Sequence, residues 1–574
     1  MADAFAGAKI SGTLPSSYMR LFSPLSWPCT YQPISLSFPS NKRPILRHPS
    51  ITKSVAFYDK FVAVETDECS QSSGELVRRI QETLRNTTDP TQALKMIDTI
   101  QHLGISHHFE EDIDAILRGL CGWDAGDNLF ATALHFRLLR HHASVPCSSD
   151  VFKKFTDARG RFKESIGRET WDLLSLYEAS YLGAEGEDIL TEAMDFTKLH
   201  LGRSLPHLSP EEGRHVERAL RHPRHLRMAR LEARDYIHEY EQCSDHTPAL
   251  LTLAKLDFDM VQSLHQKELT EICRWWKELG LADKLGFARD RPSECFLWTV
   301  GTFPEPCYSK CRIQLSKTIC ILLVMDDIFD SYGSLDELVL FTEAIRRWDL
   351  DAMEGLPEYM KICYMALYNT TNEMAYRVQR DHGLTVVAHL KRTWIDIIEA
   401  FLEEAKWFSR GHIPSFEEYL ENGVTSAGSY MAMVHAFFLI GDDLSKQNIS
   451  TMMNPYPRLF TVSGQILRLW DDLGTSTEEQ ERGDNACSIQ CYMRDNPHLE
   501  EDKARKYVRE RIGKLWWELN SIAMASKSLP WSTVKASLNV ARSAQVIYEH
   551  GDDRNAYSVD DYVQALLFRS FSNH

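Results

Sequence analysis

Asp326, Asp327 and Asp330 stand within five positions, directly after the apolar run ICILLVM at residues 319–325. Like charges at this spacing repel one another, so they need either water or a cation around them. On a helix, Asp326 and Asp330 share a face one turn apart. Two such carboxylates suit Mg²⁺, which prefers oxygen ligands and completes its shell with water and phosphate. Because the preceding run is too apolar for an exposed helix, a bound cation is favoured over a solvated charge cluster.

A second row of oxygen ligands lies 145 residues downstream, in LRLWDDLGTSTEEQERGD at residues 467–484. Asp471, Thr475 and Glu479 are four residues apart, which keeps them on one side of a helix. Arg468 precedes this row by three residues and is placed to bind an anion next to a metal. Two acidic rows that face each other across a helical bundle could clamp several Mg²⁺ ions over one diphosphate.

A third element is the stretch FARDRPSECFLW at residues 287–298, in which Arg289 and Arg291 flank an aspartate. Paired guanidinium groups suit a polyanionic leaving group, because arginine is permanently charged and forks onto phosphate oxygens. The same half of the chain has aromatic residues on apolar helical stretches. Most such residues are core, but they could also line a cavity whose π faces stabilise a carbocation. These residues are Trp298, Trp394, Tyr430 and Phe437.

Helices must position all of these residues. From about residue 74 onward the apolar positions recur with helical spacing, and no stretch shows sustained strand alternation with hairpin dipeptides. The chain is therefore predicted to be all-α. Its 574 residues exceed one ordinary core, so two domains and a tail are expected. A boundary near 265–275 is plausible, because the chemically suggestive segments all follow it.

Composition excludes several partners. The net charge of −17 argues against a nucleic-acid partner, because the chain has no general basic footprint. No uncharged apolar run approaches the roughly 20 residues that span a bilayer, so no membrane partner is expected. The 13 cysteines show no disulfide or zinc framework and are interpreted as free thiols.

The N-terminal segment, residues 1–58, has a different composition. It is basic and rich in serine, and its only acidic residue is Asp3. This is typical of a transit peptide, and a plastid (chloroplast) location is favoured over a plain disordered tail.

Taken together, DDIFD (326–330), DDLGTSTEE (471–479) and RDR (289–291) resemble the two metal motifs and the arginine motif of plant terpene synthases. The resemblance extends over nearly the whole chain. It implies two helical domains: an N-terminal α-barrel-like domain at residues 59–272 and a C-terminal class I terpenoid synthase bundle at 273–574. It also implies a prenyl diphosphate substrate, an Mg²⁺ cofactor with Mn²⁺ as the alternative ion, and a monomeric enzyme.

Carried over by position, the resemblance assigns roles to the site residues. The metal ligands would be Asp326, Asp330, Asp471, Thr475 and Glu479. Asp327 would be a supporting acid. The diphosphate would meet Arg289, Arg291 and Arg468, and Trp298 would contact the substrate.

Two departures from the family pattern bear on the product. The tandem-arginine motif RRx8W is missing, because Arg78-Arg79 has no tryptophan at the required spacing. The absence of this motif resembles the subfamily that makes acyclic alcohols. Within that subfamily, several short stretches of the sequence are most similar to geraniol synthases. Linalool, or linalool with nerolidol, is the alternative product. Relatives often have a diphosphate-binding lysine where this chain has Cys487, so one phosphate contact is replaced or lost.

Other classes fit less well. A prenyl elongation enzyme would have a second DDxxD motif, and a class II cyclase would need DxDD in the first half. A non-catalytic helical interaction protein is the alternative from a different class, although it would be expected to lose metal ligands. The basic run RHPRHLRMARLEAR at 221–234 is interpreted as a solvated face, and the pairs His107-His108 and His141-His142 as surface or packing residues.

Overall fold

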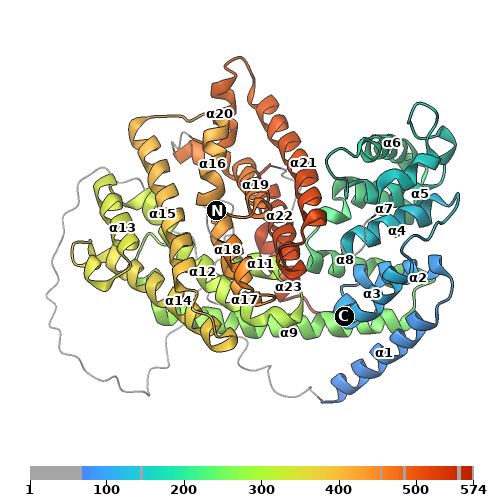
Figure 1. Cartoon of the computed structure of the whole chain (residues 1–574), viewed down its shortest axis with the longest axis horizontal. Coiled ribbons are helices and arrows are strands. Elements are labelled where there is room, and N and C mark those ends of the chain that lie inside the picture. Colours follow the sequence, from blue (N-terminus) through green and yellow to red (C-terminus); the bar gives the residue numbers. More distant parts are fainter. Residues whose placement is uncertain (1–66, 143–146, 453–454, 483–485, 553–556, 572–574) are drawn as a thin grey trace, which may run out of the picture. The chain divides into compact units, whose positions relative to one another are not determined.

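The computed structural model describes residues 67–142, 147–452, 455–482, 486–552 and 557–571, without the side chains of 67–72, 477–482 and 552. The predicted transit peptide, residues 1–58, lies outside them. The described residues fold into helices joined by short turns, and the only strand-type pairing among them is an isolated bridge between Thr156 and Phe162 (Figure 1). The all-α prediction is confirmed.

Eight helices make up the first part of the fold. Local capping explains where several of them begin. Asp89 caps the second helix by accepting from the Thr91 backbone N–H, and Ser209 forms a capping box with Glu212 at the seventh. The helices are α1 (Asp67–Asn86), α2 (Pro90–His102), α3 (Glu110–Gly119), α4 (Leu129–His142), α5 (Thr170–Ser180), α6 (Asp188–Ser204), α7 (Pro210–Arg221) and α8 (Ala229–Gln242). A hydrophobic cluster within residues 129–219 holds α4 to α7 together.

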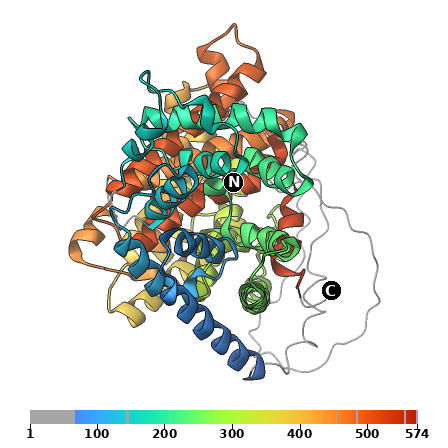
Figure 2. The ribbon, with the colours of Figure 1, turned by 90° about the vertical axis from the view of Figure 1, so that its right-hand side faces the viewer.

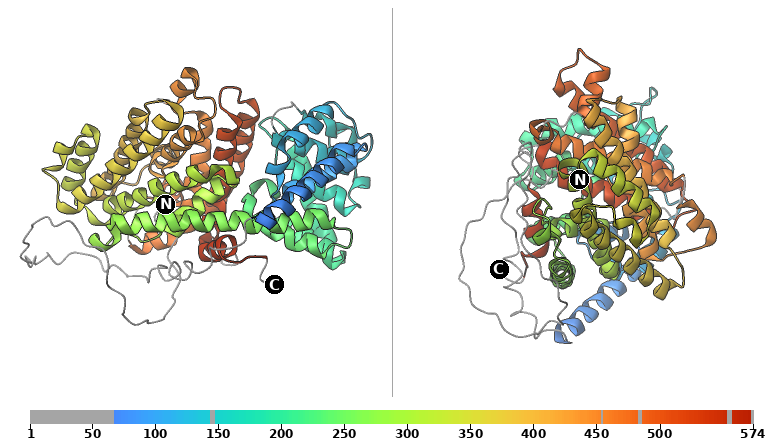
Figure 3. Two further views of the ribbon diagram at one scale, coloured as in Figure 1. Left: turned by 90° about the horizontal axis from the view of Figure 1, so that it is seen from below. Right: turned by 90° about the vertical axis from the view of Figure 1, so that its left-hand side faces the viewer.

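Helix α9 (Pro248–Leu279) connects this part to the rest of the chain. It packs against α1 and α8 as well as against α11 and α12, and Figure 3 shows it running below both groups of helices. Figure 2 shows the blue α1 beside it at the lower edge of the molecule. The helix ends at Gly280, whose φ of 66° is left-handed and therefore suits glycine. The predicted domain boundary after residue 272 falls inside this continuous helix, and the domain division stays a prediction.

The remaining helices form the second bundle, which contains the three predicted motifs. They are α10 (Leu281–Lys284), α11 (Pro292–Thr302), α12 (Ser309–Asp327), α13 (Leu335–Arg347), α14 (Glu358–His382), α15 (Val387–Arg410), α16 (Phe416–Ser426), α17 (Ser429–Ile440), α18 (Lys446–Thr451), α19 (Arg458–Arg482), α20 (Ser488–Asp495), α21 (Glu501–Ala525), α22 (Trp531–Asp552) and α23 (Val559–Leu567). Short turns between helices are η3 (Ser106–His108), η4 (Ser149–Phe155), η5 (Glu164–Ile166), η6 (Leu205–His207), η7 (Arg224–Leu226), η8 (Pro306–Tyr308), the π-helical η9 (Ile328–Tyr332) and η10 (Leu350–Met353).

Helix α12 is the central element of this bundle. Fifteen of its 19 residues are buried, because α9, α11, α14 and α17 surround it. A helix that is covered on all sides must be apolar all round, which is the reason for the run ICILLVM. The fully buried Arg312 anchors it to α9 by two hydrogen bonds, of 2.8 and 2.7 Å, to the carboxylate of Glu268.

One segment, Phe416–Ile440, is long and apolar enough to cross a membrane by length and composition. It is 72% buried inside the fold, as a core helix would be. The structure also divides it into α16 and α17, which meet at Gly428 with a φ of 76°.

Candidate active site

The three aspartates of the first motif lie where α12 passes into η9. The chain widens there into a π-helical turn, a feature that is frequent at functional sites. Asp326 is buried on the last turn of α12, with its side chain 9% exposed, whereas Asp330 is exposed on η9. The structure thus places the two predicted ligands at different depths, one at the inner end of the bundle and one at its rim.

Arg289 joins this motif to the loop before α11. Its Nη2 donates to Asp326 Oδ2 over 2.5 Å, and its backbone N–H donates to Asp327 Oδ2 over 3.0 Å. The guanidinium Nε also lies 2.7 Å from Asp327 Oδ1. Burial raises the pKa of the Asp327 carboxyl to about 6, although Arg289 opposes that shift. The motif therefore has a positive partner already in place.

A hydrogen bond to helix α9 anchors the loop that carries Arg289. Trp276 on α9 donates its indole N–H to Asp290 over 2.9 Å, so the aspartate between the two arginines orients the loop. Arg291 follows as the N-cap of α11. Burial lowers the pKa of its guanidinium, and Glu294 in the first turn of α11 opposes the shift. Both arginines of the motif are therefore fixed at the end of the bundle that contains Asp326 and Asp327.

The second motif is buried on α19. Asp471 and Thr475 are each 1% exposed, and the Thr475 hydroxyl donates to the Asp471 carbonyl over 2.8 Å. Glu479 belongs to the same helix, but its side chain lies outside the described residues. The neighbouring Asp472 has a structural role, because it accepts from the Tyr419 hydroxyl at 2.7 Å and from the Ser488 backbone N–H at 3.0 Å. Of these two aspartates, Asp471 is thus the one that suits the predicted role of metal ligand.

Arg468 lies beside this row, as predicted. Its Nη1 is 3.2 Å from Asp471 Oδ2, and its other nitrogens donate to the Gly423 carbonyl and the Ser426 hydroxyl, each over 3.3 Å. Glycine at position 423 leaves room for this arrangement, because a Cβ there would lie 3.0 Å from Arg468 Cγ, a tight contact.

Glu404 on α15 is a site residue that sequence reasoning missed. Its Oε1 accepts from the Ser426 hydroxyl at 2.6 Å and from the Asn422 amide at 3.0 Å. Burial raises the pKa of the Glu404 carboxyl, Arg468 opposes that shift and Asp326 adds to it. Glu404 therefore lies within electrostatic reach of both motifs. Its position was a usable signal, since it follows the buried residues Ile397 and Phe401 by seven and three positions on one helical stripe.

Tyr548 on α22 also faces both motifs. It is fully buried, and burial raises the pKa of its hydroxyl well above the usual value. Asp471 and Asp326 both add to this shift, so a carboxylate from each motif interacts electrostatically with the Tyr548 hydroxyl. The two acidic rows, predicted to face each other, are brought together by α12, α15, α19 and α22.

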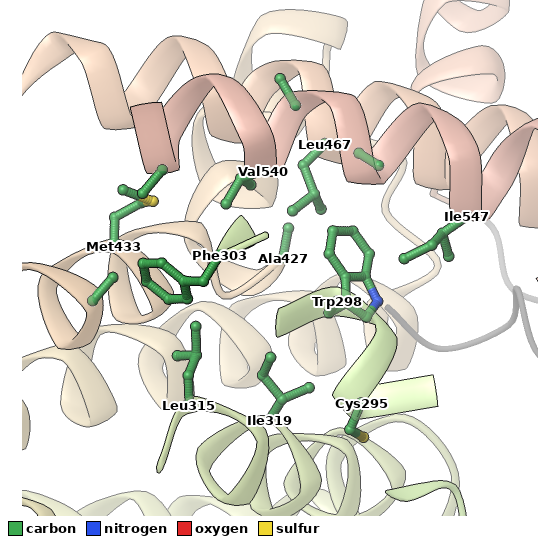
Figure 4. Close-up of a cluster of buried hydrophobic side chains, with 14 of the residues drawn as sticks. Cys295, Trp298, Phe303, Leu315, Ile319, Ala427, Met433, Leu467, Val540 and Ile547 are labelled. Carbon is green, nitrogen blue, oxygen red and sulfur yellow. The ribbon is translucent and has the colours of Figure 1, made fainter. Parts of the chain in front are cut away.

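An apolar cluster adjoins these acids. Figure 4 shows Trp298 from α11 among Leu467 from α19, Ala427 from the α16–α17 connection and Ile547 from α22. The Trp298 ring lies 5.9 Å from the ring of Tyr548 and is 3% exposed. Trp394 and Phe437 are also buried, each 1% exposed, whereas Tyr430 stacks on Tyr456 and donates to Thr461. Trp298 is therefore the aromatic residue that connects the apolar cluster to the acids.

The donor set fits a hard divalent cation. Asp326 and Asp471 are buried acids, Glu404 is a half-buried one, and Thr475 adds a hydroxyl oxygen. Oxygen donors of this type suit Mg²⁺ better than a softer metal. Cys487 is 2% exposed and is the N-cap of α20.

Comparisons with known proteins agree with this geometry. The family model of the terpene synthase metal-binding domain matches residues 277–518, and that of the terpene synthase N-terminal domain matches residues 50–220. Geraniol synthase and R-linalool synthase, both chloroplastic proteins of Ocimum basilicum, are 56% and 53% identical to this chain; each alignment covers 86% of this chain, and 86% and 85% of the respective relative.

Among solved structures, isoprene synthase from grey poplar, in complex with three Mg²⁺ ions and dimethylallyl-S-thiolodiphosphate, is 36% identical. The alignment covers 88% of this chain and 97% of the poplar protein, with a TM-score of 0.83. The two acidic motifs, the two matching family models and the similarity over most of the chain lead to one conclusion: this chain belongs to the terpene synthase family.

Proposed function

We propose that this chain is a monoterpene synthase that ionises geranyl diphosphate with Mg²⁺ and releases geraniol. The observation that carries the proposal is the meeting of Asp326, Glu404 and Asp471 from three helices next to the Trp298 cluster. Acidic groups near an apolar cluster suit a substrate with a diphosphate head and a hydrocarbon tail. Geraniol synthase of Ocimum basilicum, at 56% identity, supports the C10 alcohol as product.

In this proposal, Asp326, Asp330 and Glu404 would hold metal, and so would Asp471, Thr475 and Glu479 of the second motif. Bound Mg²⁺ would draw electron density from the diphosphate oxygens. The poplar isoprene synthase structure, with three Mg²⁺ ions, supports this choice of ion. Arg289, Arg291 and Arg468 bind the diphosphate through charge-assisted hydrogen bonds.

The bond that breaks is the allylic C1–O bond, whose electron pair leaves with the diphosphate. The apolar cluster around Trp298 surrounds the resulting allylic cation, and the indole face stabilises its charge. A water molecule then adds to C1 and loses one proton, which the released diphosphate can accept. The products are geraniol and diphosphate.

A second product follows from the same mechanism. Water capture at C3 gives linalool, and R-linalool synthase of Ocimum basilicum is 53% identical to this chain. A difference of about 1.4 kcal/mol between the two barriers changes the product ratio tenfold. Geraniol is the proposed product because the local sequence is most similar to geraniol synthases, whereas the absence of the tandem-arginine motif favours an acyclic alcohol of either kind.

The remaining proposals follow from the family. We propose that residues 1–58 direct the protein to the plastid, which the chloroplastic names of both Ocimum relatives support. Residues 59–272 and 273–574 are proposed as the two domains, and the enzyme is proposed to act as a monomer without nucleic-acid or membrane partners.

Gas chromatography with mass spectrometry of the products from geranyl diphosphate and Mg²⁺ tests the proposal. The wild-type chain should release mainly geraniol, and Asp326→Ala should release none. Asp336→Ala, at an exposed position on α13, is the matched control and should retain activity. Linalool as the main product would show that water adds to C3 and not to C1. If the wild-type chain forms no product with either Mg²⁺ or Mn²⁺, the proposed enzymatic function is wrong. The alternative of a non-catalytic helical interaction protein would then be favoured.

A further inference from the structure

A large cavity lies away from the acidic motifs, where α3, α4 and η7 meet α21 and α22. Its volume is about 770 Å³, within the range of small-molecule sites, and none of the metal or diphosphate residues lines it. Its walls instead contain much of the basic run at 221–234 and the pair His141-His142, which the proposed chemistry does not use.

The basic run is not the solvated face that was expected. Arg224, Arg227 and Arg230 all line the cavity, and their side chains are only 9%, 12% and 5% exposed. Residues of α21 and α22, which come much later in the sequence, line the same cavity. Buried arginines need partners, so the charge balance around the cavity indicates what it can bind.

Most arginines of the cavity wall are neutralised by carboxylates. Arg227 pairs with Glu232 at 2.7 Å, and Arg230 lies 3.5 Å from Asp257. Arg224 pairs with Asp98, but it shares that carboxylate with Arg137, whose Nη2 is 2.8 Å away. The carboxylate of Glu178, which accepts from the Arg224 backbone N–H over 2.8 Å, also lies within electrostatic reach of Arg137, Arg224 and Arg227, so acids balance these arginines.

Arg542 on α22 differs from these arginines. The hydrogen bonds that it makes within the described residues go to neutral groups: Nε to the His225 carbonyl and Nη1 to the Asn539 side-chain oxygen, each over 2.7 Å, and Nη2 to His225 Nδ1 at 3.4 Å. Burial lowers the pKa of Arg542 to about 10, so it is still charged at neutral pH. A half-buried cation whose hydrogen-bond partners are neutral is a ready partner for an anion.

His141 adds a second polar group at the same end. It lines the cavity and stacks on His225 with ring centroids 5.8 Å apart. Its Nε2 is buried, and no partner for it is found among the described residues. Burial lowers the pKa of His141, and the surrounding arginines add to the shift. An anion next to Arg542 would give this imidazole a hydrogen-bond partner.

The other walls define the rest of the ligand. Glu110, Glu111 and Asp114 on α3 line the cavity too, so a second anionic group is disfavoured there. Apolar side chains, including Leu182, Met524 and Leu538, line it as well. We propose that this cavity binds a phosphate monoester, with the phosphate at Arg542 and His141 and an uncharged, partly apolar body along these walls.

Calorimetric titration of the full chain with phenyl phosphate tests this site. EDTA is present throughout, so that metal-dependent binding at the acidic motifs does not contribute. Saturable 1:1 binding is expected. Arg542→Gln should weaken it by at least about tenfold, whereas Arg542→Lys, which keeps the charge, should retain most of it. Arg468→Gln, which alters the other anion site, should leave it unchanged.

A second variant tests the site even if the Arg542→Gln protein does not fold. Asn539→Asp places a carboxylate at the atom that Arg542 Nη1 already contacts, which neutralises the cation in place. It should weaken phenyl phosphate binding to a similar degree. The absence of saturable binding up to about 10 mM would overturn the proposal. So would loss of binding in Arg468→Gln but not in Arg542→Gln, and equally tight binding of benzoate would overturn the assignment of phosphate.

Discussion

Arg289 Nη2 donates a hydrogen bond to Asp326 Oδ2 over 2.5 Å, which joins the arginine motif directly to the first metal motif. These residues are 37 positions apart and belong to different elements, the loop before α11 and the last turn of α12. A metal ion at Asp326 therefore meets an arginine that is already oriented there. The same arginine is then within reach of any diphosphate that the ion binds.

Replacing Arg289 by lysine tests the need for its fork. The guanidinium contacts Asp326 and Asp327 with separate nitrogens, whereas lysine offers one point charge. Arg289→Lys should lower kcat/KM for geranyl diphosphate by at least about tenfold. Arg274→Lys, at an exposed position on α9, is the matched control and should stay near the wild-type value. Equal kcat/KM in Arg289→Lys would show that charge alone is sufficient.

Glu404 is expected to matter for metal binding. Glu404→Gln keeps the side-chain volume and one acceptor oxygen, but it removes the charge that interacts with Arg468 and Asp326. The Mg²⁺ concentration for half-maximal activity should rise roughly 10- to 100-fold. Stabilisation against heat by Mg²⁺ with diphosphate should weaken in parallel.

The adjacent Glu403 provides the control for this experiment. Its side chain is 41% exposed and pairs with Lys406 at 3.1 Å. Glu403→Gln should leave both the Mg²⁺ dependence and the thermal stabilisation unchanged. A Glu404→Gln variant with wild-type Mg²⁺ dependence would remove Glu404 from the site.

Gly423 should control the position of Arg468. In Gly423→Ala the new Cβ would lie 3.0 Å from Arg468 Cγ and 3.4 Å from its Nε, so the arginine has to shift. Small displacements of a positioning group are costly, and kcat/KM should fall roughly tenfold or more. Gly513→Ala on α21, where a Cβ meets nothing within 4 Å, should remain fully active. Steady-state kinetics of both variants decide the matter, and full activity of Gly423→Ala would contradict this role.

Acid should destabilise the second bundle through the protonation of His435 on α17. Burial lowers its pKa from 6.5 to about 3 in the folded protein. Below pH 6.5 the unfolded chain therefore binds a proton that the folded chain does not, and stability falls as pH falls. This one residue should reduce the free energy of unfolding by about 1.4 kcal/mol per pH unit between about pH 6.5 and 3.

His435→Gln separates this contribution from that of the other buried groups. Its amide can keep a hydrogen bond to the Thr393 hydroxyl, which lies 3.2 Å from His435 Nε2. Urea unfolding at pH 7, 6 and 5 should show a smaller pH dependence in this variant than in the wild type. The same slope in both proteins would mean that His435 is protonated in the folded state.

Local patterns in the sequence were sufficient for the fold class and for locating several residues that the structure brings together. The apolar run before Asp326 and the four-residue spacing of Asp471 and Thr475 are short-range signals, and one helix turn preserves them. The structure places these residues on buried helix faces, as expected. The two rows could be expected to face each other because both end apolar runs.

Tertiary structure alone decided what covers each helix face. Glu404 was missed because its contacts, Asn422 and Ser426 on α16 and Arg468 on α19, are 18 to 64 positions away. The basic run at 221–234 looked solvated because helical spacing shows which residues share a face but not what lies against it. The sequence by itself thus determined the helices and their carboxylate rows through local periodicity. Long-range packing determined the depth of each side chain, its partners and the cavity beside Arg542, because burial depends on residues that are distant in the chain.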